Sequence, residues 1–373
     1  MFEFPHPVRA AERNLSRAAR PWSRSHRAWP RLVALLVVAA VALGATGSRA
    51  QDAPASDPPS FDLSGKQIRF TTAGETLEMP AFRMMDMLEE WGAEVEKVEL
   101  TSTTGVQALL AGQAELAGQG SDELILGAAQ GADLVAIATT RDKMDYVLVV
   151  NNEIGSVDDL RGKTIGMSGP AGFDTLLARM TVRQNGMELE DVQFVQIGGS
   201  PDRAAALLAG RIDAAVVFIS DWFELQNRTQ DIKDLLYMSE LVPGAAKSVV
   251  FTKRDYLAEN QDLALALACA NLEAFEWFHE DKQRFVDYTL ENVEGTTEEA
   301  TAQLYDELVR LDMYPLDPSE LLQVDGVQAL ADAMLENGDI ENPVDAAQIV
   351  DRSYLEEAAG MGCGAQGIAT PAA

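Results

Sequence analysis

The segment from Asp159 to Thr175 constrains the fold of this chain more than any other part. Its sequence is Asp-Leu-Arg-Gly-Lys-Thr-Ile-Gly-Met-Ser-Gly-Pro-Ala-Gly-Phe-Asp-Thr. The pattern predicts a buried strand over 163–167, then a loop of small residues, then a helix that opens near Asp174. Such a loop leaves backbone N–H groups free at a helix N-terminus, where they can hold a polar or anionic group. We therefore expect a ligand-binding loop here.

A second unit of the same kind follows, with a strand over 192–197, the loop Gly-Gly-Ser-Pro-Asp, and a helix over 203–209. The preceding part of the chain alternates in the same way. Its predicted strands are 67–71, 95–100, 114–118 and 134–139, and its predicted helices are 79–91, 106–111 and 123–130. This alternation predicts an α/β fold with mainly parallel, doubly wound sheets.

We expect two such lobes joined by a hinge, with a helical C-terminal region. An apolar strand over 146–151 is interpreted as the crossing out of lobe one, and a strand over 248–252 as the return. Lobe one then comprises 66–151 and 247–357, and lobe two comprises 152–246 and closes with a strand over 214–218 and an aromatic turn at 220–223. The expected C-terminal helices are 255–279, 281–291, 296–311, 318–336 and 344–357, and residues 358–373 are expected to form a flexible tail.

The first 50 residues have the pattern of a secretory signal peptide. Residues 1–31 carry seven Arg, 32–47 are apolar, and Ser48-Arg49-Ala50 offers small residues at a cleavage site. The apolar stretch is short for a membrane span, although an uncleaved anchor and a start codon further downstream remain open. No Cys at the cleavage site could accept a lipid. We expect cleavage, a disordered leader at 51–65, and a periplasmic protein.

The charge of the chain excludes some partners. Its 29 Lys and Arg face 59 Asp and Glu, and removal of residues 1–50 takes away eight Arg and two Glu, which leaves a formal charge of −36. Nucleic acids and anionic membrane surfaces are poor partners for such a surface. The charge indicates a strongly solvated exterior and says little about the ligand.

Cysteine and histidine are too few for several kinds of active site. After processing, Cys269 and Cys363 remain, and either a disulfide or a buried free thiol at Cys269 is compatible with the sequence. The single remaining histidine, His279, is interpreted as a helix-surface residue. One histidine excludes His-based zinc sites and disfavours a Ser-His-Asp triad. We expect no catalytic residues, no metal and no cofactor.

Three segments carry a resemblance to type II periplasmic solute-binding proteins. The 159–175 segment resembles their entry into the second lobe, and residues 105–117 and 204–215 resemble their paired helix–Gly–strand segments. The end of the chain, Val-Asp-Arg-Ser-Tyr-Leu-Glu-Glu at 350–357, is similar to one group in particular. That group binds nitrate, taurine and aliphatic sulfonates, or pyrimidine precursors of thiamine, for ABC importers. The resemblance spans nearly all of 66–357.

The resemblance implies a monomeric binding protein that captures a small polar solute by hinge closure and delivers it to an inner-membrane ABC permease. The hinge is expected near Asn151 and Ala246. A pyrimidine-precursor synthase related to this group is the enzyme alternative, but it would need a reactive His and a Cys-rich iron segment. A secreted ligand-sensing module is the other alternative, and the sequence does not separate it from transport.

The ligand is expected beyond the carboxyl ends of the strands, where loops and helix N-termini converge. Phe173, Phe218 and Trp222 are candidates to stack on a flat ligand, with core packing as the alternative. Asp174 and Asp221 could accept hydrogen bonds from a ligand amine or ring N–H, or cap a helix, and capping is favoured for Asp174. The full predicted set is Thr72, Glu75, Met79, Thr103, Thr104, Gln119, Ser121, Ser168, Gly169, Ala171, Gly172, Phe173, Asp174, Gly199, Ser200, Phe218, Asp221 and Trp222.

The chain departs from the group's pattern at its first loop. Glu75, Glu78 and Met79 precede Pro80, where a small residue and Pro are common in the group. Two carboxylates near the cleft disfavour a doubly charged anion. We therefore expect a nitrogen heterocycle or an amine, and otherwise a sulfonate- or nitrate-type anion. Arg203 could pair with a ligand carboxylate or sulfonate, or form a surface salt bridge.

Overall fold

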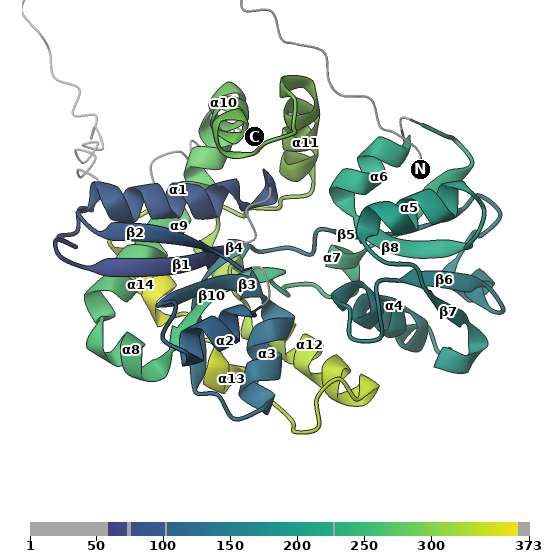
Figure 1. Ribbon diagram of the computed structural model, residues 1–373, viewed down its shortest axis with the longest axis horizontal. Coiled ribbons are helices and arrows are strands. Elements are labelled where there is room, and N and C mark those ends of the chain that lie inside the picture. Colours follow the sequence, from purple (N-terminus) through teal and green to yellow (C-terminus); the bar gives the residue numbers. More distant parts are fainter. Residues whose placement is uncertain (1–58, 73–75, 101–102, 227, 365–373) are drawn as a thin grey trace, which may run out of the picture. The chain divides into compact units, whose positions relative to one another are not determined.

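The computed structural model describes residues 59–72, 76–100, 103–226 and 228–364, which form two five-stranded sheets (Figure 1). The first sheet has the order β2-β1-β3-β10-β4. β1 runs parallel to β2 and β3, whereas β10 is antiparallel to β3 and β4. Its strands are β1 (Gln67–Thr72), β2 (Glu94–Glu99), β3 (Leu116–Gly120), β4 (Leu134–Arg141) and β10 (Ser248–Lys253).

The second sheet has the order β7-β6-β8-β5-β9. β6 runs parallel to β7 and β8, and β5 is antiparallel to β8 and β9. Its strands are β5 (Tyr146–Asn151), β6 (Thr164–Met167), β7 (Gln193–Gln196), β8 (Ala214–Phe218) and β9 (Ile232–Tyr237). Each sheet is therefore mainly parallel, with one strand that crosses over from, or returns to, the other sheet.

Strand pairing assigns two segments differently from the sequence. The strand Tyr146–Asn151, which the sequence placed at the end of lobe one, pairs only with strands of the second sheet. β9 at Ile232–Tyr237 was not anticipated, because its Lys and Asp interrupt the apolar run that marks the other central strands. Lobe one is the first sheet with its helices, and lobe two is the second sheet with its helices.

The helices of lobe one include the whole C-terminal region. They are η1 (Thr76–Glu78), α1 (Met79–Glu90), α2 (Gly105–Leu110), α3 (Ser121–Ala129), α8 (Arg254–Glu259), α9 (Gln261–Glu280), α10 (Lys282–Asn292), α11 (Glu298–Arg310), η4 (Pro318–Glu320), α12 (Val324–Asn337), α13 (Ala346–Ile349) and α14 (Ser353–Gly360). The helix predicted over 255–279 is two helices, because the backbone leaves helical geometry at Asn260. The helices predicted over 318–336 and 344–357 are likewise each broken into two.

Lobe two has shorter helices between its strands. They are η2 (Val157–Leu160), α4 (Phe173–Gln184), η3 (Leu189–Asp191), α5 (Ser200–Leu208), α6 (Ile219–Gln226) and α7 (Met238–Leu241). The aromatic turn predicted at 220–223 is the first half of α6. Trp222 and Leu225 on this helix are buried, and this apolar spacing favours a helix over a turn.

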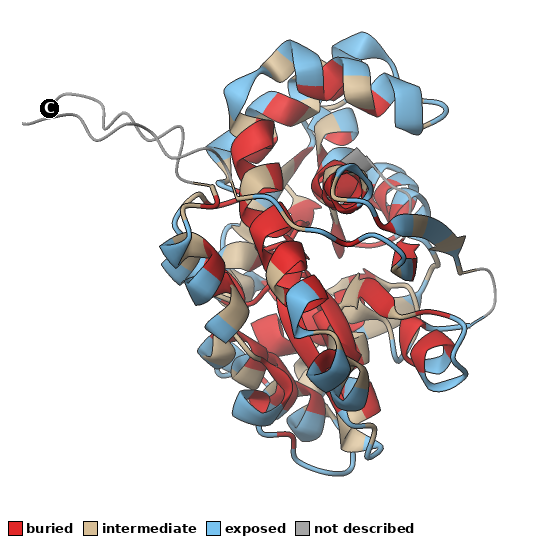
Figure 2. Ribbon diagram, turned by 90° about the vertical axis from the view of Figure 1, so that its left-hand side faces the viewer, coloured by how far each residue is buried: buried red, intermediate tan, exposed pale blue. Residues whose placement is uncertain are grey.

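The core gathers along both sheets and the helices packed on them, shown in red in Figure 2. The central helix α9 has 14 buried residues among its 20, and it packs against α1 and α14. None of the described helices is both long enough and apolar enough to cross a membrane. The predicted signal peptide lies outside the described residues.

A disulfide joins α9 to the C-terminal turn. Cys269 and Cys363 are bonded with their Cα atoms 5.3 Å apart, so the sequence alternative of a free thiol at Cys269 is wrong. The flexible tail predicted from 358 onward begins too early. Residues 358–364 complete α14 and a following turn, in which Gly364 N donates a hydrogen bond of 2.9 Å to Glu273.

The chain passes between the sheets at 142–145, between β4 and β5, and at 242–247, between α7 and β10. A buried ion cluster lies at the first crossing. Arg141, the last residue of β4, forms ion pairs with Glu78 at 3.0 Å and with Asp145 at 2.5 Å. Thr72 donates a hydrogen bond of 3.1 Å to the same Glu78. This cluster fixes the geometry at which the chain leaves lobe one.

Candidate ligand-binding site

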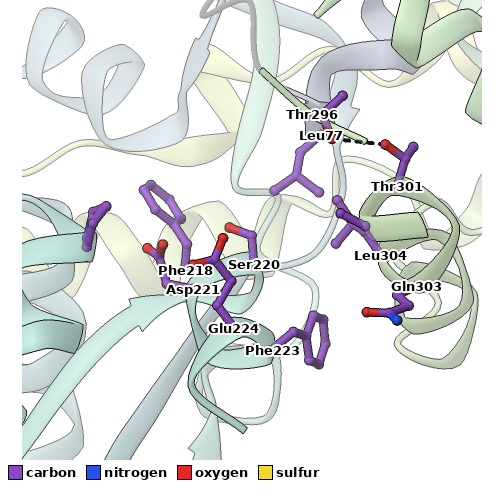
Figure 3. Close-up of a pocket in the computed structure, with 12 residues that line it drawn as sticks. Leu77, Phe218, Ser220, Asp221, Phe223, Glu224, Thr296, Thr301, Gln303 and Leu304 are labelled. Atoms are coloured by element: carbon purple, nitrogen blue, oxygen red, sulfur yellow. Dashed lines mark hydrogen bonds between the residues drawn. The ribbon is translucent and has the colours of Figure 1, made fainter. Parts of the chain in front are cut away.

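A cavity of about 450 Å³ lies between lobe one and the loops of lobe two (Figure 3). Lobe one contributes Leu77, which precedes α1, and the start and one face of α11. Lobe two contributes the last residue of β8, residues 220–224 of α6 and Pro201 of α5. The full lining is Leu77, Pro201, Phe218, Ser220, Asp221, Phe223, Glu224, Thr296, Ala300, Thr301, Gln303 and Leu304.

The charged groups of this lining are both carboxylates, Asp221 and Glu224 on α6. The hydroxyl of Ser200 donates a hydrogen bond to Asp221, and the same hydroxyl accepts one of 2.9 Å from the Phe218 N–H. Burial raises the pKa of Asp221, while the Ser200 hydrogen bond opposes this rise. The result is a positioned acceptor on the acidic wall of the cavity, beside Glu224.

An aromatic cluster adjoins the cavity. Tyr146 at the start of β5 stacks on Phe218 with ring centroids 4.6 Å apart and lies 5.9 Å from the Phe173 ring. Phe218 lines the cavity, whereas Phe173 is half-buried at the first position of α4. The sequence identified the two Phe residues but missed Tyr146. Its position at the start of the crossing strand was the available signal.

The loop after β6 is held by its own side chains. Ser168 donates from both N–H and hydroxyl to Asp174, and Thr175 donates a hydrogen bond of 2.7 Å to Gly169 O. A Cβ at Gly172 would stand 2.0 Å from Ser168 Oγ, so this close turn requires glycine. Ala171 at the tip of the loop is exposed. The loop leads directly into α4, and in the described structure the N-cap Gly172 offers no side-chain hydrogen bond to the first N–H groups of this helix.

Asp174 was predicted as a ligand acceptor or a helix cap, with capping favoured. Gly172 is the N-cap, and the Asp174 carboxylate, 5% exposed, instead accepts from Ser168 at the start of the loop. Arg203 is 2% exposed and donates to the carbonyls of Gly198 and Val216. Arg203 is therefore neither at the surface nor directed at the cavity, because the buried carbonyls of its own lobe take its N–H groups.

In lobe one, the predicted polar residues support the loops. Thr104 caps α2 in a capping box with Gln107, and Thr103 beside it is exposed. Gln119 donates a hydrogen bond of 3.2 Å to Thr71 Oγ1, and the buried Ser121 hydroxyl donates to Ala246 O. The Ser121 contact ties the N-terminus of α3 to the second crossing.

Some predicted residues lie away from the cavity. Met79 and Trp222 are core side chains, 0% and 2% exposed, because the apolar faces of α1 and α6 pack inward. Thr72 is buried against Glu78. Gly199 is exposed as the N-cap of α5. Glu75 lies outside the described residues.

Lys247, just before β10, was not predicted. It is 8% exposed, and its Nζ lies 4.5 Å from the centroid of the Phe173 ring and 5.8 Å from that of Tyr146. The sequence signal for this position is a lysine directly ahead of the apolar return strand.

The remaining chemistry-bearing side chains have structural partners. His279 is half-buried, and its Nε2 lies 2.8 Å from Tyr314 O, so the predicted surface position is only partly right. Among the described residues, the metal-ligand types that come together are Cys269, Glu273 and Cys363. The two sulfurs are bonded to each other and offer no thiolate.

Several solved structures share this fold, and they include periplasmic binding proteins. The periplasmic aliphatic sulphonate binding protein SsuA from Escherichia coli matches with a TM-score of 0.64 and 21% identity over 78% of this chain and 93% of that one. The periplasmic nitrate-binding protein NrtA from Synechocystis PCC 6803 matches with a TM-score of 0.61 and 14% identity over 82% and 90%. A Candida albicans protein described as exhibiting the generic periplasmic binding protein structural fold matches with a TM-score of 0.54 and 14% identity over 79% and 96%.

These matches confirm the predicted fold class, two α/β lobes of the periplasmic binding protein type. A search among curated protein sequences finds no match. Residues 88–284 match the family described as NMT1/THI5 like, a span of more than half of the chain that includes every strand of lobe two. The chain therefore belongs to the NMT1/THI5 like family.

Proposed function

We propose that this chain is an exported substrate-binding protein that captures a small polar organic solute between its lobes and delivers it to an ABC importer. Its family and its similarity in fold to SsuA and NrtA support this role. We further propose that it acts in the periplasm as a monomer, binds its ligand without converting it, and uses no cofactor. The signal-peptide pattern of residues 1–50 supports export.

The cavity beside Asp221 carries this proposal. Its volume of about 450 Å³ suits a small organic molecule, and its walls combine apolar side chains with a few polar groups. Phe218 and Phe223 offer apolar faces, whereas Thr296, Thr301 and Gln303 offer hydrogen-bonding groups (Figure 3). Such a lining selects by shape and by hydrogen bonds.

The ligand that fits this cavity is an amine or a nitrogen heterocycle. Asp221 and Glu224 accept hydrogen bonds, and no Lys or Arg belongs to the cavity lining among the described residues. An anion placed here would meet two carboxylates and no compensating cation, whereas an amine or a ring N–H would meet acceptors. Phe218 offers a ring on which a flat ligand can stack.

Capture would proceed by hinge closure at the crossings 142–145 and 242–247. A ligand shifts this equilibrium only by its preference for the closed form. The lining of the cavity comes from both lobes, so a ligand can contact α6 and α11 together only when the two helices are close. A ligand that makes both contacts therefore favours the closed form. Micromolar affinity, about −8 kcal/mol, would suffice for uptake.

A thermal-shift screen of the processed chain tests the proposal, with amines, nitrogen heterocycles, sulfonates and nitrate in separate wells. We expect amines or heterocycles to raise the melting temperature, and Asp221→Asn to reduce that shift. Stabilisation by sulfonates or nitrate alone would contradict the ligand assignment. Uptake of the stabilising compound by cells that hold the gene, and its loss on deletion, would separate transport from sensing.

A further inference from the structure

Lys247 is a buried lysine that forms no direct ion pair with the described residues. Its side chain is 8% exposed, and no carboxylate oxygen of the described residues lies within 4.0 Å of Nζ. Arg141 shows the usual arrangement, because it is equally buried but contacts both Glu78 and Asp145. A buried cation without an ion pair is costly unless another group compensates it.

The ammonium group of Lys247 remains accessible to solvent. The described structure gives it neither a hydrogen bond nor an ion pair, yet Nζ is absent from the fully buried polar atoms that lack a partner. It therefore keeps contact with solvent. Aromatic faces border it, with Phe173 at 4.5 Å and Tyr146 at 5.8 Å. Tyr146 stacks on Phe218, which lines the cavity, so the rings beside Nζ are continuous with the wall of the cavity.

Two helix N-termini flank the same position. α3 begins at Ser121, whose N–H donates a hydrogen bond of 3.1 Å to Lys247 O. α4 begins at Phe173, whose ring lies under Nζ. Both helices direct the positive ends of their dipoles toward this region.

Two carboxylates lie at the starts of these helices. Asp122 of α3 and Lys247 Nζ both border Gly120 but form no ion pair, and Asp174 of α4 is bound to Ser168 and lies near Arg203. The ammonium of Lys247 is therefore bounded by aromatic rings and has no direct ion pair with the described residues.

We infer that Lys247 holds an acidic group of the captured solute. Combined with the acceptors Asp221 and Glu224, which rest on the function proposed above, this makes the ligand dipolar. It carries a carboxylate at Lys247, a basic nitrogen at the acidic wall, and a flat or apolar body against the Phe173–Tyr146–Phe218 cluster. Amino-substituted aromatic or heteroaromatic acids are the chemical class that meets all three conditions.

Three probes that differ only in charged groups test this inference. 4-(Aminomethyl)benzoate has both charges, benzylamine has only the amine, and benzoate has only the carboxylate. Their dissociation constants are measured by calorimetry on the full chain, with millimolar concentrations included. We expect the dipolar probe to bind at least tenfold more tightly than benzylamine, since a charged hydrogen bond contributes on the order of a tenfold change.

Lys247→Met removes the charge and keeps the length of the side chain. We expect it to abolish the advantage of 4-(aminomethyl)benzoate over benzylamine, and Lys247→Arg to restore part of it. Lys97→Met is the matched control, because Lys97 also lies over a ring, Phe82 at 4.1 Å, but is exposed. The melting temperature of each unliganded variant reports whether it is folded.

The outcomes separate this inference from the proposed function. If benzylamine binds but the carboxylate adds nothing, or adds equally in Lys247→Met, the anion contact is wrong and amine capture stands. If benzoate binds through Lys247 and benzylamine does not bind, the anion contact stands and the amine assignment is wrong. If none of the probes binds, the dipolar class is rejected.

Discussion

The guanidinium Nε of Arg203 lies 3.6 Å from Asp174 Oδ2, and both side chains are buried. Arg203 also donates hydrogen bonds of 3.0 Å to Val216 O and 2.6 Å to Gly198 O. One side chain of α5 therefore joins β8, the loop before α5, and the start of α4. The two loops singled out in the sequence are held in one arrangement by this contact, which makes the cleft side of lobe two rigid.

Arg203→Met is expected to destabilise the fold by about 3–5 kcal/mol, because it leaves Asp174 buried without its cation. Arg203→Met combined with Asp174→Asn should recover part of this loss, because the unpaired charge is then absent. Urea unfolding of wild type, both single variants and the double variant gives the coupling energy. Additive losses in the double variant would show that the pair is not coupled.

Asp142 is expected to make stability depend on pH. It lies in the first crossing, accepts a hydrogen bond of 2.8 Å from Leu322 N, and burial raises its pKa from 3.8 to about 7. Between these values the folded state binds more protons than the unfolded state, so the free energy of unfolding falls as pH rises. The total loss in the free energy of unfolding is up to about 4 kcal/mol, and it is complete once the pH is above the pKa of the folded state.

Asp142→Asn keeps the acceptor for Leu322 N and removes the titration. The difference in unfolding free energy between Asp142→Asn and wild type should increase from pH 4.5 to pH 7.5 in favour of the variant. Asp312→Asn serves as the control, because Asp312 is an exposed neighbour bound to Lys143. A difference that stays constant across this range would contradict the raised pKa.

The disulfide between Cys269 and Cys363 should contribute strongly to stability, because it closes a loop with a sequence separation of 94 residues. Constraint of a loop of this size in the unfolded chain is worth about 4 kcal/mol. Reduction, or the Cys269→Ala/Cys363→Ala variant, should lower the free energy of unfolding by roughly this amount. Unfolding curves with and without reductant measure the loss, and coincident curves would refute it.

The sequence predicted the alternation of strands and helices well, because each element carries a strong apolar period. It predicted β5 and β8 with their observed ends, Tyr146–Asn151 and Ala214–Phe218. The sequence-based prediction failed where contacts between distant parts of the chain determine the structure. The sheet to which β5 belongs depends on its partners β8 and β9, and the pairing of Cys269 depends on how the chain end returns to α9. The local sequence pattern specifies neither the sheet to which β5 belongs nor the pairing of Cys269.

The candidate site was predicted less completely than the fold. Phe218 and Asp221 line the cavity, and the buried Ser200 at the start of α5 forms hydrogen bonds with both. The cavity residues of α11 and the buried Lys247 could not be inferred, because they come from lobe one and meet lobe two only through the folded crossings. Met79 and Trp222 do not belong to the site because their side chains are buried in the core.

Ser200 should determine ligand affinity without touching the ligand. Its hydroxyl accepts from Phe218 N and donates to Asp221, so it positions both the aromatic face and the acceptor. Ser200→Ala removes both hydrogen bonds, each worth about 0.5–1.5 kcal/mol, and should weaken benzylamine binding several-fold. Ser220→Ala is the matched control, because Ser220 is exposed, lines the same cavity and supports neither residue through a hydrogen bond in the described structure. Calorimetric titration of both variants would reject this positioning role if they lost affinity equally.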